Sequence, residues 1–201
     1  MAYFRISDAL AAYEHYAQRQ LVFKSADKIL ASEARTKPVT TTYEIFLSHA
    51  FEDAKLILGV KLLLEAEGRT VYVDWLDDEQ LDRAKVTPAT AALLRARMQA
   101  SQSLLFATSK ASPDSRWMPW ELGYFDGLRP GKISILPLLG AYDTSFKGQE
   151  YLGLYPVVER LQTTGGEMKT GVVKRAPLVE KDQYAWLQDF TKGTTSFRTF
   201  S

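Results

Sequence analysis

The segment RWMPWELGYFDG, residues 116–127, holds the most unusual set of side chains in this sequence. Proline breaks a helix unless it lies in the first turn, so Pro119 predicts a helix that begins just before it, with Glu121 in the same turn. The spacing of four brings the side chains of Trp117 and Glu121 close together at that helix start. The indole and the carboxylate would then share one pocket, near the crevice expected at the end of the sheet.

A structural interpretation of the same residues is also open. Glu121 would then only offset the helix dipole or complete a cap, and the tryptophans would belong to the core. The residue types alone do not decide between a catalytic and a structural carboxylate.

Several other chemistries lack their motifs. The sequence has no GxGxxG or GxxxxGK[ST] loop for a nucleotide and no GxSxG elbow for a nucleophilic serine. His15 and His49 do not have the spacing of metal ligands, and the chain has no cysteine. We therefore expect no metal site and no bound cofactor.

Composition limits the class of protein and its partners. With 201 residues, 46% of them hydrophobic, the chain can bury one substantial core. Its 25 basic and 24 acidic residues give a net charge of +1, so neither nucleic acid nor an anionic membrane is an expected partner. The first ten residues do not form a secretory signal, and no apolar run approaches the ~20 residues of a membrane helix. These features predict a cytoplasmic protein.

The elements that must position Glu121 follow a strand-then-helix order. A helical pattern over residues 7–34 and a linker with Pro38 predict an N-terminal helical extension, residues 1–42, followed by the main domain, residues 43–201. Within that domain the patterns predict strands over 43–48, 70–74, 103–107, 132–139 and 155–159, and helices over 53–67, 88–100, 118–127 and, as a closing helix, 179–191.

Strands separated by helices need crossover connections, which predicts an α/β fold with a parallel sheet. The ligand of such a sheet lies in the crevice beyond the carboxyl ends of its strands. The segments expected at this crevice are residues 48–53, 74–86, 108–121 and 140–146.

Four runs, YEIFLSHAFED, TVYVDW, SLLFATS and WMPWELGYF, resemble the successive boxes of a TIR domain of the bacterial kind, in order and spacing. The resemblance covers about residues 43–146. It implies the TIR fold, a flavodoxin-like parallel sheet of about five strands with flanking helices. Residues 75–87 stand where the family has its BB loop, although the usual Pro-Gly pair is absent.

The resemblance also implies an activity and a site. Trp117 and Glu121 match the WxxxE pattern of enzymatic TIR domains, whose glutamate is catalytic in cleavage of the nicotinamide–ribose bond of NAD. NAD is then a substrate, and the products are nicotinamide with ADP-ribose or a cyclic ADP-ribose isomer. Trp117 would stack on a ring of the substrate and favour cyclisation. In bacterial relatives the product serves immune signalling through a separate effector.

The remaining candidates for binding substrate come from the first two boxes. Ser48 and His49 could reach phosphate or ribose, or could cap the following helix. Phe51 could cover the pocket or staple that helix, and Asp53 is expected to cap it. Asp74 could orient the loop that follows it. The charge run over residues 77–85 is typical of a solvated face, yet its mixed signs also suit contacts between TIR copies.

Two other functions remain open at this point. A TIR domain can act without catalysis, by TIR–TIR association alone, although the joint presence of Trp117 and Glu121 argues against this. A nucleoside deoxyribosyltransferase is another flavodoxin-like enzyme with an essential glutamate. For the enzymatic TIR interpretation we expect self-association, because TIR enzymes generally complete their site with the BB loop of a neighbouring copy.

Overall fold

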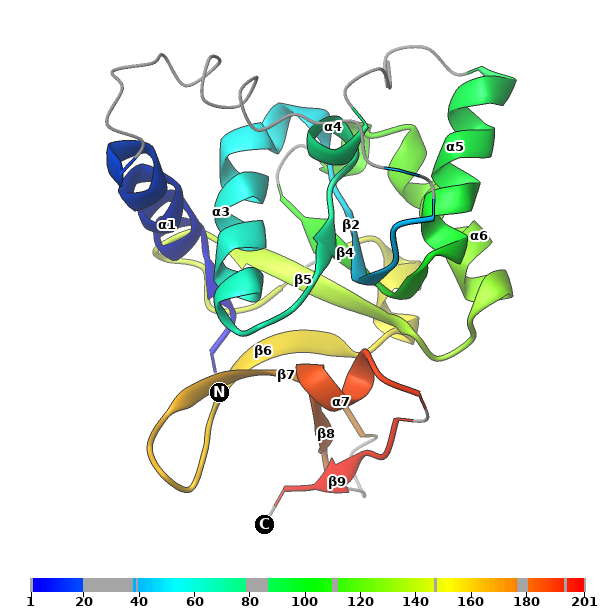
Figure 1. Cartoon of the computed structure of the whole chain (residues 1–201). Helices are drawn as coiled ribbons and strands as arrows, with labels where there is room; N and C mark the ends of the chain where they lie inside the picture. The colour runs from blue at the N-terminus through cyan, green and yellow to red at the C-terminus, as the bar shows by residue number, and fades with distance from the viewer. Residues whose placement is uncertain are drawn as a thin grey trace.

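A computed structural model describes residues 2–19, 38, 40–78, 87–109, 112–146, 148–176, 181–193 and 195–200. Five of its strands form the parallel sheet that the sequence predicts (Figure 1). In sheet order they are β3 (Val71–Tyr72), β2 (Tyr43–Ser48), β4 (Ser101–Thr108), β5 (Ile133–Leu139) and β6 (Val157–Gln162), and each neighbouring pair is parallel. The sheet therefore has the strand order of flavodoxin-like folds.

Helices cover both faces of this sheet. On one face lie α1 (Ile6–Arg19) and α3 (Ala54–Ala66), and on the other lie α5 (Pro88–Gln99) and α6 (Trp117–Leu128) (Figure 1). Successive residues of β2 alternate between the two cores, since Ile45 and Leu47 pack with α3 while Phe46 packs with α6. Burial on both faces explains why the strands are continuous apolar runs.

Local signals set the helix ends as expected. Thr87 caps α5 by accepting a hydrogen bond from the Thr90 N–H at 3.1 Å, and Pro88 occupies the first helical position. Gly68, which follows α3, has a φ of 77°, a left-handed conformation that glycine adopts readily. Four short elements complete the crevice region: η1 (Phe51–Asp53), α4 (Asp74–Asp77), η2 (Ser112–Asp114) and η3 (Glu150–Leu154).

The N-terminal segment packs into the same core as the main domain. Strand β1 (Phe4–Arg5) pairs in parallel with the end of β5, and α1 packs on α3. The two helices touch through their backbones, because a Cβ on Gly59 would lie 1.9 Å from the Ala9 carbonyl oxygen. The division into residues 1–42 and 43–201 stays a prediction, and residues 20–37 lie outside the described region of the chain.

The C-terminal region differs from expectation. Strands β7 (Met168–Lys174), β8 (Gln183–Trp186) and β9 (Arg198–Thr199) extend the sheet in antiparallel order beyond β6. The predicted closing helix over residues 179–191 is wrong, since its described portion is β8 followed by the single turn α7 (Leu187–Phe190). Pairing with the free edge of β7 satisfies backbone groups that a helix here would leave open. No helix among the described residues is long and apolar enough to cross a membrane.

Candidate functional site

Glu121 and Ser48 form the centre of the candidate site. Ser48 is the last residue of β2, and its hydroxyl donates a hydrogen bond to Glu121 Oε2 at 2.5 Å. Both side chains are buried, with 1% of each residue exposed. The chain leaves β2 toward β3 on one side and β4 lies on the other, so the pair lies at the topological switch point where α/β sheets bind ligands.

The helix that carries Glu121 begins slightly earlier than expected. Trp117 is the first residue of α6, so Pro119 is the third, as the rule for proline in a first turn requires. Glu121 is the fifth residue and begins the second turn, which corrects the prediction that it lies in the first. The short O–H···O distance to Ser48 is typical of a charge-assisted hydrogen bond. The nearby helix N-terminus adds further stabilisation for a negative charge.

His49 connects the first box to the segment after β3. Its Nδ1 lies 2.8 Å from the Leu47 carbonyl oxygen, and its Nε2 accepts a hydrogen bond from the Trp75 indole N–H at 3.1 Å. These partners assign the proton to Nδ1 in a neutral ring. Asp74 lies beside it, with Oδ1 3.5 Å from His49 Nε2 and 2.8 Å from the Trp75 backbone N–H, whose hydrogen bond it accepts. Asp74 thus begins α4 beside His49, and its roles in binding substrate or orienting the following segment stay predictions.

The tryptophans of α6 pack in an aromatic cluster on the same face of the sheet. Trp117 is 6% exposed and meets Trp120 edge to face, with ring centroids 5.3 Å apart. Trp120 stacks on Tyr124, and the Arg95 guanidinium lies 5.4 Å from its centroid. Stacking of Trp117 on a substrate ring stays a prediction, as does the binding role of His49. The side chain of Phe51 lies outside the described region of the structure.

The charge run after β3 is not a solvated face where the structure describes it. Asp77 and Asp78 are 2% and 1% exposed. Asp78 accepts hydrogen bonds from Arg97 Nε at 2.7 Å, Arg97 Nη2 at 2.6 Å and the Tyr72 hydroxyl at 2.9 Å, while Asp77 accepts one from the Val73 N–H. The hydrogen bond to Asp78 raises the pKa of Arg97. The predicted solvated face is therefore wrong for these two residues, and residues 79–86 lie outside the described region.

Asp53 does not cap the helix that follows it, so this prediction is wrong. It precedes α3 at the N-cap position but makes no side-chain cap. Its carboxylate instead accepts a hydrogen bond from the Ser109 hydroxyl in the loop after β4, and burial raises the pKa of Asp53. Ser48 likewise gives its hydroxyl to Glu121 rather than to a helix end. Asp53 thus joins the segments after β2 and β4, and Ser48 joins β2 to α6, instead of capping a helix.

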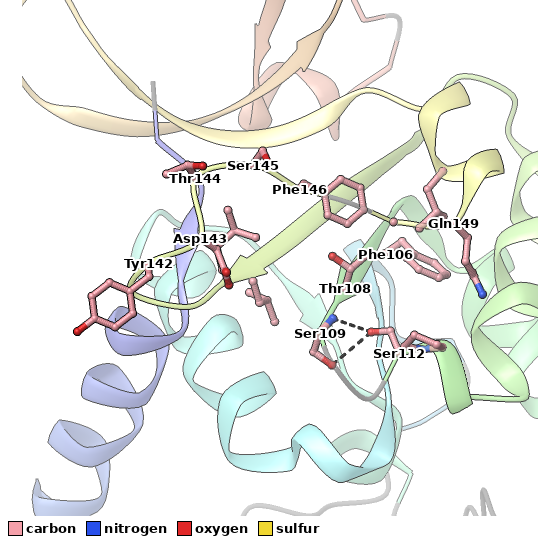
Figure 2. A pocket seen from close by; sticks show the side chains of 15 residues that line it. Phe106, Thr108, Ser109, Ser112, Tyr142, Asp143, Thr144, Ser145, Phe146 and Gln149 are labelled. Atoms are coloured by element: carbon pink, nitrogen blue, oxygen red, sulfur yellow. Dashed lines mark hydrogen bonds between the residues drawn. The ribbon is translucent and has the colours of Figure 1, made fainter.

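A cavity of about 570 Å³ opens at the carboxyl ends of β4 and β5 (Figure 2), and Phe106 in its wall is the register partner of Ser48. Its described walls come from the ends of β4 and β5, the segments on either side of η2's start, residues 142–146, 148 and 149, and η3, among them Phe106, Thr108, Ser109, Ser112, Asp143 and Phe146. The predicted crevice segment 140–146 thus contributes to a real cavity. The described residues contain no group of three or more side chains suited to hold a metal ion.

Comparison with known proteins shows relatives of one kind. A protein from Bacillus cereus, strain MSX-D12, named probable 3' cyclic ADP-D-ribose synthase ThsB', is 51% identical over 147 residues, which is 73% of this chain and 74% of that protein. The chain belongs to the TIR-domain family of cyclic ADP-D-ribose synthases.

More distant similarities are shorter. A putative cyclic ADP-D-ribose synthase TIR2 from Cytobacillus dafuensis is 29% identical over 83 residues, 41% of this chain and 22% of that protein, so the chain spans only about a fifth of it. The TIR domain of the Toll-related receptor TRR-2 from Hydra magnipapillata is 20% identical, with a TM-score of 0.39 over 54% of this chain and 77% of the receptor domain. No protein-family model matches the chain.

Proposed function

We propose that this TIR protein cleaves the nicotinamide–ribose bond of NAD and closes the product into a cyclic ADP-ribose isomer, with Glu121 as the catalytic residue. The observation that carries the proposal is the buried Glu121 carboxylate at the sheet's switch point, held by the Ser48 hydroxyl at 2.5 Å. The 51% identity to a protein named probable 3' cyclic ADP-D-ribose synthase supports the same activity.

The reaction suits a site built around one carboxylate. Nicotinamide leaves with the electron pair of its bond to the ribose C1, which turns a cationic ring into a neutral molecule. Because the leaving group needs no proton, no general acid is required. Positive charge builds on the ribose as the bond breaks, and an ionised Glu121 would stabilise it. In this proposal Ser48 is a positioning residue that fixes the orientation of the carboxylate.

The nucleophile decides the product. If water bonds to C1 the product is linear ADP-ribose, whereas attack by a hydroxyl of the adenosine ribose gives a cyclic isomer, and each route releases one proton to solvent. Trp117, whose indole is buried near the start of α6, would exclude water and favour the second route. A cyclic nucleotide can diffuse through the cytoplasm to a separate effector protein. We infer that the product acts in this way in bacterial immune signalling.

Glu121→Gln tests the proposal, because glutamine keeps the size of the side chain and removes its charge. We expect kcat for nicotinamide release to fall about a hundredfold or more, while NAD affinity stays within a few fold. Glu14→Gln, an exposed substitution on α1, is the matched control and should retain normal turnover. Unchanged nicotinamide release by Glu121→Gln would show that this carboxylate is not catalytic.

A further inference from the structure

The cavity at the ends of β4 and β5 lies near the proposed catalytic carboxylate, but Glu121 is not one of its described lining residues. Phe106, in the cavity wall, is the register partner of Ser48 in the β2–β4 pair, so the two residues lie on adjacent strands about 4.8 Å apart. Glu121 and Ser48 are not among the described residues that line the cavity. A ligand long enough to reach both places would have one end next to the carboxylate and its other end in the cavity, farther along the sheet.

The chemistry of the described lining suits a neutral ring and a sugar. Phe106, Leu152 and Phe146 form apolar walls, and the hydroxyl groups of Thr108, Ser109 and Ser112 follow one edge (Figure 2). The described lining residues include one carboxylate, that of Asp143, and no basic side chain. This lining favours a nucleoside over a phosphate group, and about 570 Å³ falls within the usual ~300–1,000 Å³ range of small-molecule sites.

The walls of this cavity are held in place by specific contacts. Ser112 Oγ accepts a hydrogen bond from the Ser109 N–H at 2.7 Å and lies 3.2 Å from the Ala107 carbonyl oxygen, to which it donates. Arg5 of β1 donates to the carbonyl oxygens of Gly140 and Asp143 at 2.9 and 2.7 Å, which fixes the opposite rim. A preformed wall lowers the entropy cost of ordering the site around a ligand.

Gly148 leaves room for the Phe146 ring. A Cβ at residue 148 would lie 2.3 Å from Phe146 Cζ, so the ring occupies space that only a glycine leaves open. Phe146 also packs against the core on the α5 and α6 face, with Leu152 as a member of the same cluster. The aromatic wall of the cavity thus belongs to the folded core.

We propose that this cavity binds the adenosine end of NAD. The assignment rests on the proposed function: bond cleavage places the nicotinamide ribose at Glu121, so the neighbouring cavity takes the other end of the dinucleotide. Its apolar walls would contact the adenine ring, and its hydroxyl edge would hold the ribose. Closure of a cyclic product requires a hydroxyl of this ribose to reach C1 of the other, so the cavity would also select which hydroxyl attacks.

The two halves of NAD provide the test. AMP and nicotinamide mononucleotide are titrated separately, by calorimetry, into the parent protein and into the variants Phe146→Ala and Thr108→Val. The threonine-to-valine substitution removes a hydroxyl group and leaves the volume of the side chain nearly unchanged. We expect both variants to weaken AMP binding, Phe146→Ala by about tenfold or more, and to leave nicotinamide mononucleotide binding unchanged. Leu154→Ala, at an 80% exposed position that is not in the lining, is the control and should bind AMP normally.

Two results would overturn the assignment: AMP affinity that is equal in all four proteins, or a loss confined to nicotinamide mononucleotide. Nicotinamide release from NAD is measured on the same preparations, so that the two proposals can fail separately. A chain that binds AMP through Phe146 but releases no nicotinamide contradicts the proposed function. Normal release together with unchanged AMP binding in both variants contradicts only the cavity assignment.

Discussion

At the scale of single residues, the Ser48–Glu121 contact shows how a buried carboxylate is kept in a defined orientation. Taking a carboxylate out of water is costly unless hydrogen bonds replace its solvation, and Glu121 is 1% exposed. The Ser48 hydroxyl supplies one such bond at 2.5 Å. Because Ser48 ends a central strand and is buried, the sheet holds this donor next to the carboxylate.

Ser48→Ala should therefore reduce turnover through Glu121. A hydrogen bond to a charged group contributes about 1.5–3 kcal/mol, so we expect kcat to fall about tenfold to a hundredfold. Ser103→Ala is the control, since Ser103 is equally buried in β4 and its hydroxyl donates to the Glu44 carbonyl oxygen at 2.8 Å. It should lower the melting temperature without lowering kcat. If Ser48→Ala and Ser103→Ala had equal kcat values, Ser48 would not be a positioning residue for Glu121.

The sequence predicts some of this detail and misses the rest for a physical reason. Ser48 ends a strand and Glu121 lies in the second turn of a helix that begins at the crevice end of the sheet, so their proximity follows from topology. The pairing of Asp78 with Arg97 joins residues 19 positions apart, and Asp53 meets Ser109 across 56 positions. No local pattern distinguishes these side chains from solvated ones, because their partners are set only by tertiary packing.

At the scale of elements, the Asp78–Arg97 pair joins three segments around the start of the crevice loop. Asp78 follows α4, and Arg97, 0% exposed, belongs to α5. Arg97 Nη1 also donates to the Pro38 carbonyl oxygen at 2.7 Å, which attaches the segment before the main domain. The end of α4 is thus tied to a helix that covers the sheet.

Arg97→Met should destabilise the protein strongly, because it leaves the Asp78 carboxylate buried without its partner. Breaking one side of a buried ion pair costs about 3–5 kcal/mol, which urea unfolding would measure as a loss of unfolding free energy. The double variant Arg97→Met/Asp78→Leu removes both charges and should recover much of that loss. A single variant as stable as the parent would mean that the pair does not hold α4 in place.

The C-terminal strands show why the parallel sheet was predictable and its extension was not. Strands β4 and β5 are long and buried on both faces, so their sequences differ clearly from those of helices. In contrast, β8 has four residues, of which only Ala185 is buried, and α7 follows it directly. A strand this short is decided by the free edge of β7 beside it rather than by its own residues.

At the scale of the whole molecule, the crevice is the end of the sheet at which α4 begins. Asp74 and Trp75 lie against His49, one residue from Ser48. These contacts hold the start of α4 beside the proposed site. The resemblance to TIR enzymes implies that residues 75–87 contact a second copy of the chain, and a site shared between copies becomes complete only when they associate.

We therefore predict that specific activity rises with protein concentration, because dilution separates the copies that complete one another's sites. Mixing two inactive chains makes the prediction sharper. One carries Glu121→Gln, and the other has residues 79–86 replaced by a glycine–serine linker of equal length, with its folding checked by thermal melting. If Glu121 of one copy works with the loop of its neighbour, the mixture should regain nicotinamide release that neither chain shows alone. Specific activity that stays flat over a wide concentration range, together with an inactive mixture, would show that each copy holds a complete site of its own.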